Sequence, residues 1–277
     1  MKSFHNKVAA ITGAGSGIGQ QLAVALAQQG CHLALSDINP AGLVETVNLL
    51  KSADIRITTQ ILDVADRDAM KSWAAETVRQ HGAVHLIFNN AGVALGSTVE
   101  GCSYQDLEWI ININLWGVIY GTKEFLPWIK QAGEGHIVNI SSLFGLTAHA
   151  SQSAYNATKF AVRGFTESLR QELDIQNRGV SALCVHPGGI QTNIANAAKM
   201  QDNLSSLGMD PVEATESFNQ LLRCTPEDAA TQILQAIQKN KRRLLIGTDA
   251  KILDLIQRIF PTHYPKIITW MSQLSRR

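Results

Sequence analysis

The chain has 277 residues, of which 45% are hydrophobic, and a formal net charge of +1. Its length suits one large α/β domain with an ample core, and its composition excludes a disordered chain. The balanced charge gives no reason to expect a polyanionic partner, so nucleic-acid binding is disfavoured. No leader-like segment and no apolar run of about 18 residues is present, which favours a cytoplasmic protein.

A short apolar run at 8–11 leads into a glycine-rich turn at 12–19, and apolar residues then recur at helical spacing. This pattern predicts a strand, a turn and a helix. Glycine permits positive φ and a close approach to a ligand, and a helix N-terminus favours a phosphate. The spacing departs from the common Gly-x-Gly-x-x-Gly fingerprint, and no Gly-Lys follows as in a P-loop. We therefore expect a pyrophosphate site at this turn.

The next predicted strand, 32–36, ends at Asp37, eighteen residues after Gly19. A carboxylate there can accept both ribose hydroxyls of an adenosine and would repel a 2′-phosphate. Neither Ser16 nor Ile38 supplies a compensating cation, so the sequence favours NAD over NADP. The alternative is that Asp37 only starts a turn or caps the helix after Pro40.

The remaining elements alternate between apolar strands and amphipathic helices. This alternation predicts one doubly wound α/β domain over 1–277, with about seven parallel strands, helices on both faces and ligands at the carboxyl ends of the strands. Helices are expected at 40–51, 66–81, 103–130, 152–176 and from 226, and strands at 56–62, 84–89, 136–140, 181–185 and 243–246.

Tyr155 and Lys159 are four residues apart in the predicted helix 152–176, so both side chains lie on one helical face. A nearby ammonium favours the phenolate, which predicts a lowered Tyr155 pKa and a group that exchanges protons near neutrality. Taken alone, the pair also occurs on many solvated helices.

Together these motifs resemble the short-chain dehydrogenase/reductase family of the large single-domain Rossmann type, over residues 6–247. The resemblance is carried, in order and spacing, by the glycine turn, Asn89–Gly92, a serine thirteen residues before Tyr155, Tyr155-x-x-x-Lys159 and Pro187-Gly188. It implies hydride transfer between a nicotinamide and an alcohol or ketone.

By this resemblance Tyr155 is the general acid/base and Ser142 the catalytic serine, while Ser141 is structural. Lys159 would lower the pKa of Tyr155 and bind the nicotinamide ribose. Asn114, in preference to Asn112, would hold a water beside the lysine. The alternative for Asn114 is a buried amide that bonds within the fold, and both roles can coexist.

The resemblance also implies a set of cofactor contacts. Two of these residues have an alternative, purely structural role: Asp63 could form a turn at the end of its strand, and Thr192 could cap a helix. The contacts are Gly13, Ser16, Gly17, Ile18 and Gly19 at the pyrophosphate, Asp37 and Asn90 at the adenosine ribose, Asp63 and Val64 at the adenine, and Tyr155, Lys159, Pro187, Gly188, Ile190 and Thr192 near the nicotinamide.

Residues 191–223 form a polar stretch with little periodicity that resembles the family's substrate lid. Nearby apolar residues favour a hydrophobic secondary alcohol or ketone as substrate. They are Leu95, Leu143, Phe144, Leu146, His149, Ile194, Met200 and Phe218.

Residues 248–277 form a basic, amphipathic extension. It could lie on a membrane surface, cover the substrate pocket, pack on a partner subunit or cap the core. A homodimer or homotetramer is expected by resemblance. The four cysteines are scattered without metal-ligand spacing, so neither a disulfide nor a metal is predicted.

Two other functions are compatible with the family. One is an epimerase or dehydratase that uses bound NAD, and the other is a non-catalytic dinucleotide sensor. The intact Ser142, Tyr155 and Lys159 disfavour the sensor, since a sensor needs no poised phenol.

Overall fold

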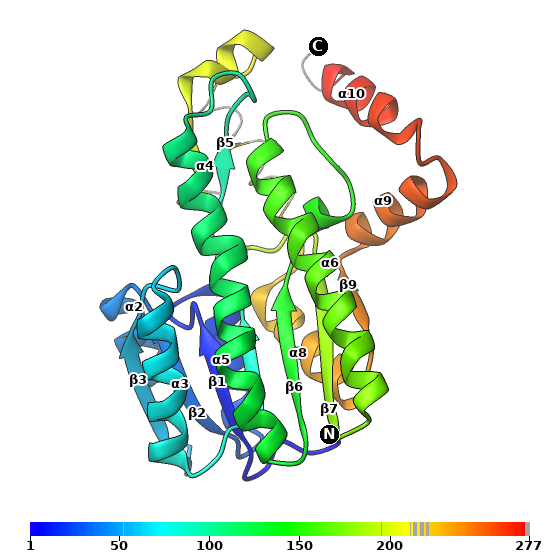
Figure 1. Ribbon diagram of the computed structural model, residues 1–277. Helices are drawn as coiled ribbons and strands as arrows, with labels where there is room; N and C mark the ends of the chain where they lie inside the picture. The colour runs from blue at the N-terminus through cyan, green and yellow to red at the C-terminus, as the bar shows by residue number, and fades with distance from the viewer. Residues whose placement is uncertain are drawn as a thin grey trace.

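The computed structural model describes residues 1–51, 53–194, 196–210, 212, 215–216, 219 and 222–274, with side chains as far as 270. Its main sheet has seven strands: β1 Val8–Thr12, β2 His32–Asp37, β3 Ile57–Ile61, β4 Leu86–Asn89, β6 Gly135–Ile140, β7 Val180–Pro187 and β9 Arg243–Ile246. Their order is β3-β2-β1-β4-β6-β7-β9, and every pairing is parallel (Figure 1). The predicted fold class is therefore confirmed.

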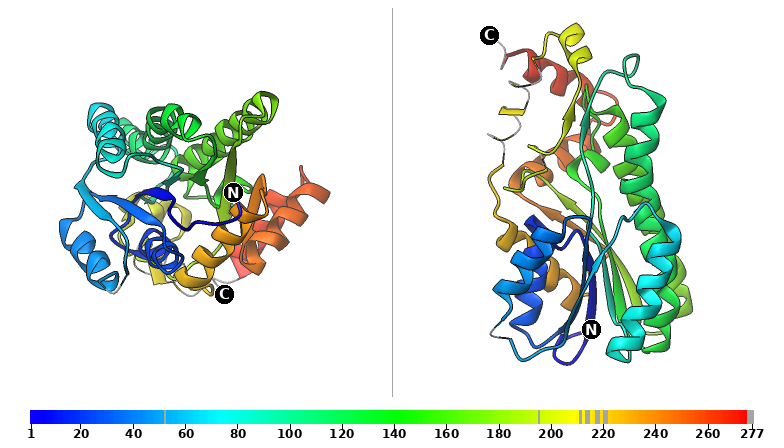
Figure 2. Two further views of the ribbon diagram at one scale, coloured as in Figure 1. Left: turned by 90° about the horizontal axis from the view of Figure 1, so that it is seen from below. Right: turned by 90° about the vertical axis from the view of Figure 1, so that its left-hand side faces the viewer.

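Helices cover both faces of the sheet (Figure 2). They are α1 Gly17–Ala27, α2 Pro40–Leu49, α3 Arg67–His81, α4 Tyr104–Ile111, α5 Gly117–Gln131, α6 Ser153–Gln176 and α8 Pro226–Gln238. Strand side chains alternate between the two faces. On β1, Ala9 and Ile11 join the core beneath α1 and α8, whereas Val8 and Ala10 join the core beneath α3, α5 and α6. Burial on both sides explains the uninterrupted apolar strand.

The long helix predicted at 103–130 is interrupted in the structure. A π-helical turn, η1 Asn112–Trp116, separates α4 from α5. Such turns insert one extra residue into a helix and are frequent at functional sites. Immediately after it, α5 approaches the sheet closely: a Cβ at Gly121 would lie 2.0 Å from Asn89 Oδ1. Glycine permits this contact, while the π turn itself has no local sequence signal.

The described part of the predicted lid is fastened to the loop after β4. Its strand β8 Lys199–Met200 pairs in parallel with β5 Leu95–Gly96 of that loop, and the 3-10 helix η3 Asp202–Leu207 follows. The sequence predicted none of these elements. The Asn203 side chain accepts a 2.9 Å hydrogen bond from Thr98 N, and the Gln201 amide donates to Asp106 at 2.7 Å. These bonds hold the described part of residues 191–223 over the carboxyl edge of the sheet.

The C-terminal extension forms two helices beyond β9, at one side of the molecule (Figure 1). They are α9 Thr248–Ile259 and α10 Tyr264–Leu274. Within the described ranges, no helix combines the length and hydrophobicity needed to cross a bilayer. Residues 275–277, which include two of the basic residues of the predicted extension, lie outside the described residues.

Candidate active site

The glycine turn lies at the carboxyl end of β1, where the strand order reverses between β1 and β4. Gly13 and Gly17 have φ values of +64° and +54°, which favour glycine. A Cβ at Gly19 would lie 2.1 Å from the Gly13 carbonyl oxygen. The Asn90 amide donates to the carbonyl oxygens of Thr12 and Gly13, at 3.0 and 3.1 Å. Asn90, which is expected to contact the adenosine ribose, therefore also holds the glycine turn in place.

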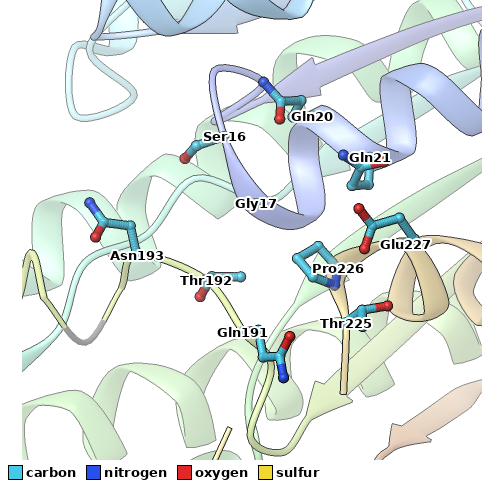
Figure 3. A pocket seen from close by; sticks show the side chains of 10 residues that line it. All are labelled: Ser16, Gly17, Gln20, Gln21, Gln191, Thr192, Asn193, Thr225, Pro226 and Glu227. Carbon is cyan, nitrogen blue, oxygen red and sulfur yellow. The ribbon is translucent and has the colours of Figure 1, made fainter. Parts of the chain in front are cut away.

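A cavity of about 370 Å³ opens beside the first turn of α1 (Figure 3). Ser16 and Gly17 line it from the glycine turn, Thr192 from the loop after β7, and Pro226 from the start of α8. The N-terminus of α1 has no side-chain cap, which suits a phosphate. In contrast, α8 begins with Pro226, which has no N–H, and Thr225 caps it by accepting from Asp228 N. The remaining lining residues are Gln20, Gln21, Gln191, Asn193, Thr225 and Glu227.

Asp37 lies against the glycine turn, where its Oδ2 accepts a 2.8 Å hydrogen bond from Gly15 N. Its Oδ1 accepts from Asn39 N at 2.9 Å, and Asn39 in turn caps α2. The helix-cap alternative for Asp37 is thus wrong, although the carboxylate does shape the turn before α2. The negative charge stands at the position where the ribose is expected.

The other predicted adenine-side residues have structural partners. Asp63 Oδ1 accepts from Ala65 N at 2.9 Å, as expected for a turn former, and Asp66 caps α3. Val64 is buried, and its side chain packs closely against Gly117. These contacts fix the loop at the end of β3.

On the nicotinamide side, Pro187 ends β7 and Gly188 follows it. Ile190 is buried, and its carbonyl accepts a 2.7 Å hydrogen bond from Thr192 N. Thr192 reaches the glycine turn: a Cβ at Gly17 would lie 3.0 Å from its methyl group. The loop after β7 and the turn after β1 thus meet at the cavity. Ile18, on α1, packs partly buried against the core.

Helix α6 carries Tyr155 and Lys159 into the interior, where they are 7% and 3% exposed. Lys159 Nζ lies 5.5 Å from the centroid of the Tyr155 ring. Ser142, at the end of β6, forms a hydrogen bond with Tyr155, and its Oγ accepts from Phe144 N at 3.1 Å. The structure therefore brings the serine, the phenol and the ammonium together, as the sequence predicts.

The expected lowering of the Tyr155 pKa is wrong for this structure. Burial raises the pKa of Tyr155 to about 12, and the hydrogen bond with Ser142 offsets only part of that increase. Burial also lowers the pKa of Lys159 to about 8. The Lys159 ammonium donates to the Ile140 carbonyl at 3.1 Å. Desolvation is therefore the largest influence on both pKa values, and Tyr155 is a neutral phenol near neutral pH.

Asn114 lies in the π turn and is fully buried. Its Oδ1 accepts from Val93 N at 2.8 Å, and its amide donates to the Val93 carbonyl at 2.9 Å. It also lies near Lys159: a Cβ at Gly92 would be 3.2 Å from Asn114 Oδ1 and 3.4 Å from Lys159 Nζ. The buried-amide role of Asn114 is confirmed, while its water-holding role stays a prediction.

Two polar neighbours position the catalytic segment. Ser141 Oγ donates to the Lys159 carbonyl at 2.8 Å, which confirms a structural role for this serine. The Asn156 amide donates to the carbonyls of Phe144 and Thr147 at 2.9 and 3.1 Å, and so fastens the loop after Ser142 to α6. The sequence did not predict this role of Asn156, although its place beside Tyr155 was a usable signal.

Residues far along the chain complete this region, and no local sequence signal marks them. Asp249 Oδ2 accepts a 2.7 Å hydrogen bond from Gly189 N, in the loop after β7. Tyr264 accepts from Ala148 N at 3.3 Å, which joins α10 to the loop after Ser142. The buried His186 ring bonds through Nδ1 to the Ser142 carbonyl at 3.0 Å.

The structure brings only some of the predicted pocket residues into one apolar cluster. Leu95 and Phe144 belong to one apolar cluster with Tyr155. Phe144 also packs edge-on against Tyr155 and His149, at centroid distances of 5.9 and 4.6 Å. Leu143 and Leu146 are buried in the loop after Ser142, while Ile194 and Met200 are half-buried and Phe218 lies outside the described residues.

A doubly wound parallel sheet with a glycine turn at its switch point defines a class of dinucleotide-binding α/β proteins. Comparison with known proteins narrows this class. The family model described as short chain dehydrogenase matches residues 7–203. The chain belongs to the short-chain dehydrogenase/reductase family and is an oxidoreductase of that family.

Two relatives and one solved structure illustrate the similarity. "Putative oxidoreductase SadH" of Mycobacterium tuberculosis is 45% identical over 97% of this chain and 96% of its own. "Cyclohexanol dehydrogenase" of an Acinetobacter species is 38% identical over 68% of this chain and 75% of its own. A short-chain dehydrogenase/reductase from Burkholderia phymatum, solved in complex with NAD, has a TM-score of 0.86 and 29% identity, covering 94% of this chain and 95% of its own.

Proposed function

We propose that the protein is an NAD-dependent oxidoreductase that interconverts a hydrophobic secondary alcohol and its ketone. The observation that carries this proposal is the convergence of Ser142, Tyr155 and Lys159 in the interior, beside an apolar cluster and near the glycine turn. A buried phenol that is hydrogen-bonded to a serine hydroxyl suits proton transfer to or from a substrate oxygen.

The residues of the glycine turn and the loop after β7 fit a dinucleotide. Gly17 would lie at its pyrophosphate, Ile190 and Thr192 would lie near the carboxamide, and Lys159 would bind the nicotinamide ribose. When bound, the nicotinamide accepts or supplies the hydride. The relative from Burkholderia phymatum, whose structure contains NAD, supports this fit.

The preference for NAD over NADP rests on Asp37. Its carboxylate lies against Gly15 and would accept the ribose hydroxyls, whereas a 2′-phosphate there would meet a like charge. A structure from Mycobacterium paratuberculosis, 26% identical and solved with NAD, is consistent with this preference.

In the reduction direction, neutral Tyr155 donates its proton to the carbonyl oxygen of the substrate. The hydroxyl of Ser142 donates a second hydrogen bond to the same oxygen and stabilises the charge that develops there. The Lys159 ammonium stabilises the phenolate left on Tyr155, and a water held near Asn114 returns a proton to it. In the oxidation direction the same steps run in reverse: Tyr155 passes its proton to the water near Asn114, the Lys159 ammonium stabilises the resulting phenolate, and the phenolate accepts the alcohol proton.

The substrate class follows from the surroundings of Tyr155. Leu95 and Phe144 flank the phenol, so the oxygen of a substrate would meet a polar group while its carbon skeleton meets apolar side chains. The name of the relative cyclohexanol dehydrogenase supports a cyclic secondary alcohol as the first candidate. We also propose a homodimer or homotetramer on the basis of family membership.

The test is a panel of hydrophobic alcohols and ketones with the purified protein, monitored by NADH absorbance. We expect net NADH formation or consumption with at least one compound, and a loss of about 10²-fold or more in kcat for Tyr155→Phe. A variant with full activity would contradict the role of Tyr155. Turnover without net cofactor change would instead indicate the epimerase or dehydratase cycle, and NAD binding without turnover of any compound would indicate a sensor.

A further inference from the structure

Helix α9 turns an acidic residue inward and three large apolar residues outward. Asp254, one of its two acidic residues, is 7% exposed, while Ile252, Leu255 and Ile259 are 52%, 57% and 58% exposed. Asp254 points to the core because it pairs with Arg243 at 3.1 Å. This anchor turns the apolar residues, which are spaced three and four apart, outward as one stripe.

Two further exposed apolar residues follow the stripe along the chain. Phe260, in the connection to α10, and Trp270, on α10, are 50% and 60% exposed. We call Ile252, Leu255, Ile259, Phe260 and Trp270 the C-terminal apolar face. Helices α9 and α10 lie at one side of the molecule (Figure 1), and the exposed fractions of these five side chains show that the described chain leaves them largely uncovered. Large apolar residues exposed on consecutive helices indicate an interaction site.

The charge around this face is positive. Residues 248–277 contain five Lys or Arg and two Asp, a formal net charge of +3 in a chain whose total is +1. Lys251 and Lys266 are exposed. Both acids are engaged within the fold, since Asp249 accepts from Gly189 N and Asp254 pairs with Arg243 and Arg258. Among the described residues of this segment, every exposed charged side chain is therefore positive.

We propose that the C-terminal apolar face docks on an anionic lipid bilayer. Apolar side chains bordered by lysine and arginine suit the interface between lipid tails and anionic headgroups. A second copy of the chain fits less well, because a two-fold contact through this face would place two segments of the same positive charge against each other.

Docking through this face would bring the bilayer close to the candidate active site. Tyr264, at the start of α10, accepts a hydrogen bond from Ala148 N, in the loop that follows Ser142. A bilayer under α9 and α10 would thus lie beside the loop that carries Phe144, next to the apolar cluster. If the proposed function holds, a hydrophobic substrate dissolved in lipid has a short path to Tyr155, but bilayer docking itself does not depend on that function.

The test is co-sedimentation of the full chain with vesicles of phosphatidylcholine alone and of phosphatidylcholine mixed with phosphatidylglycerol. We expect binding to the anionic vesicles that weakens with salt. Leu255→Glu/Ile259→Glu should reduce binding by about tenfold or more. The matched control is Val44→Glu/Leu49→Glu on α2, whose two residues are 59% and 57% exposed and whose substitution should leave vesicle binding unchanged.

Circular dichroism would verify that both double variants are folded. Failure of the wild-type protein to sediment with anionic vesicles would overturn the proposal, as would unchanged binding by the folded Leu255→Glu/Ile259→Glu variant. Light scattering identifies the competing occupant: a wild-type oligomer that dissociates in this variant, without vesicle binding, would assign the face to a second copy.

Discussion

The side-chain ammonium of Lys159 donates a hydrogen bond to the main-chain carbonyl of Ile140 at 3.1 Å, in the interior beside the end of β6. Burial lowers the pKa of Lys159 to about 8, so this lysine changes its charge within the pH range in which enzymes are ordinarily assayed. Burial raises the pKa of Tyr155 to about 12, so the phenol stays protonated over the same range. The two groups thus titrate separately.

The first prediction concerns the pH dependence of ketone reduction. Tyr155 remains a proton donor up to about pH 12, but Lys159 carries the charge that stabilises the developing phenolate only below about pH 8. We expect kcat/KM for reduction to be level below pH 8 and to fall by up to about tenfold per pH unit above it. Steady-state rates from pH 6 to pH 10 measure this, with thermal unfolding curves to exclude loss of structure. A level profile through pH 10 would contradict the prediction.

The second prediction concerns the choice of cofactor. Replacing Asp37 by serine and Ile38 by arginine removes the repulsion of a 2′-phosphate and supplies a cation for it. We expect the ratio of kcat/KM for NAD to that for NADP to fall by roughly a hundredfold. The control is Asp37→Asn, which removes the charge but keeps an acceptor for Gly15 N. A wild-type preference for NADP would show that the role assigned to Asp37 is wrong.

The third prediction concerns the loop after β7. Asp249→Ala removes the carboxylate that accepts from Gly189 N, so the loop that carries Ile190 and Thr192 loses an anchor. Loss of a charge-assisted hydrogen bond costs about 1.5–3 kcal/mol, which corresponds to roughly a tenfold or larger increase in the Kd for NADH. Fluorescence titration measures that Kd. Asp249→Asn keeps an acceptor and should restore most of the affinity, whereas equal affinities for wild type and Asp249→Ala would exclude the anchor.

The fourth prediction concerns stability in acid. Burial lowers the pKa of His81, His136 and His186 to about 4, 4 and 3. These side chains are neutral in the folded state but take up protons in the unfolded state below their usual value near 6.5. The stability they contribute is complete above pH 6.5. It should decrease by up to about 1.4 kcal/mol per pH unit for each histidine as the pH falls towards 4.

Urea unfolding at intervals between pH 7 and pH 4 measures this loss. His136→Asn, which cannot titrate, should have a shallower pH dependence than the wild type. An identical slope for the two proteins would show that His136 is not kept neutral by the fold.

The structure shows why some residue roles were predictable and others were not. Asp37, Ser142 and Tyr155 each stand at the end of a strand or on a helix whose place follows from the alternation of elements. Asp249 lies 60 residues beyond Gly189, and Tyr264 lies 116 residues beyond Ala148, yet both contact the same region. Nothing in their local sequence indicates those contacts, because they depend on how α9 and α10 fold back.

The sequence by itself determined the doubly wound sheet, the glycine turn and the set of residues at its edge, because hydrophobic periodicity and glycine spacing are local properties of the chain. Only the tertiary structure decided the protonation of Tyr155 and Lys159, the π turn at Asn114 and the outward apolar stripe of α9. Each of these depends on burial or on a partner distant in the sequence. Desolvation and long-range pairing are set by packing, which the spacing of residues along the chain does not specify.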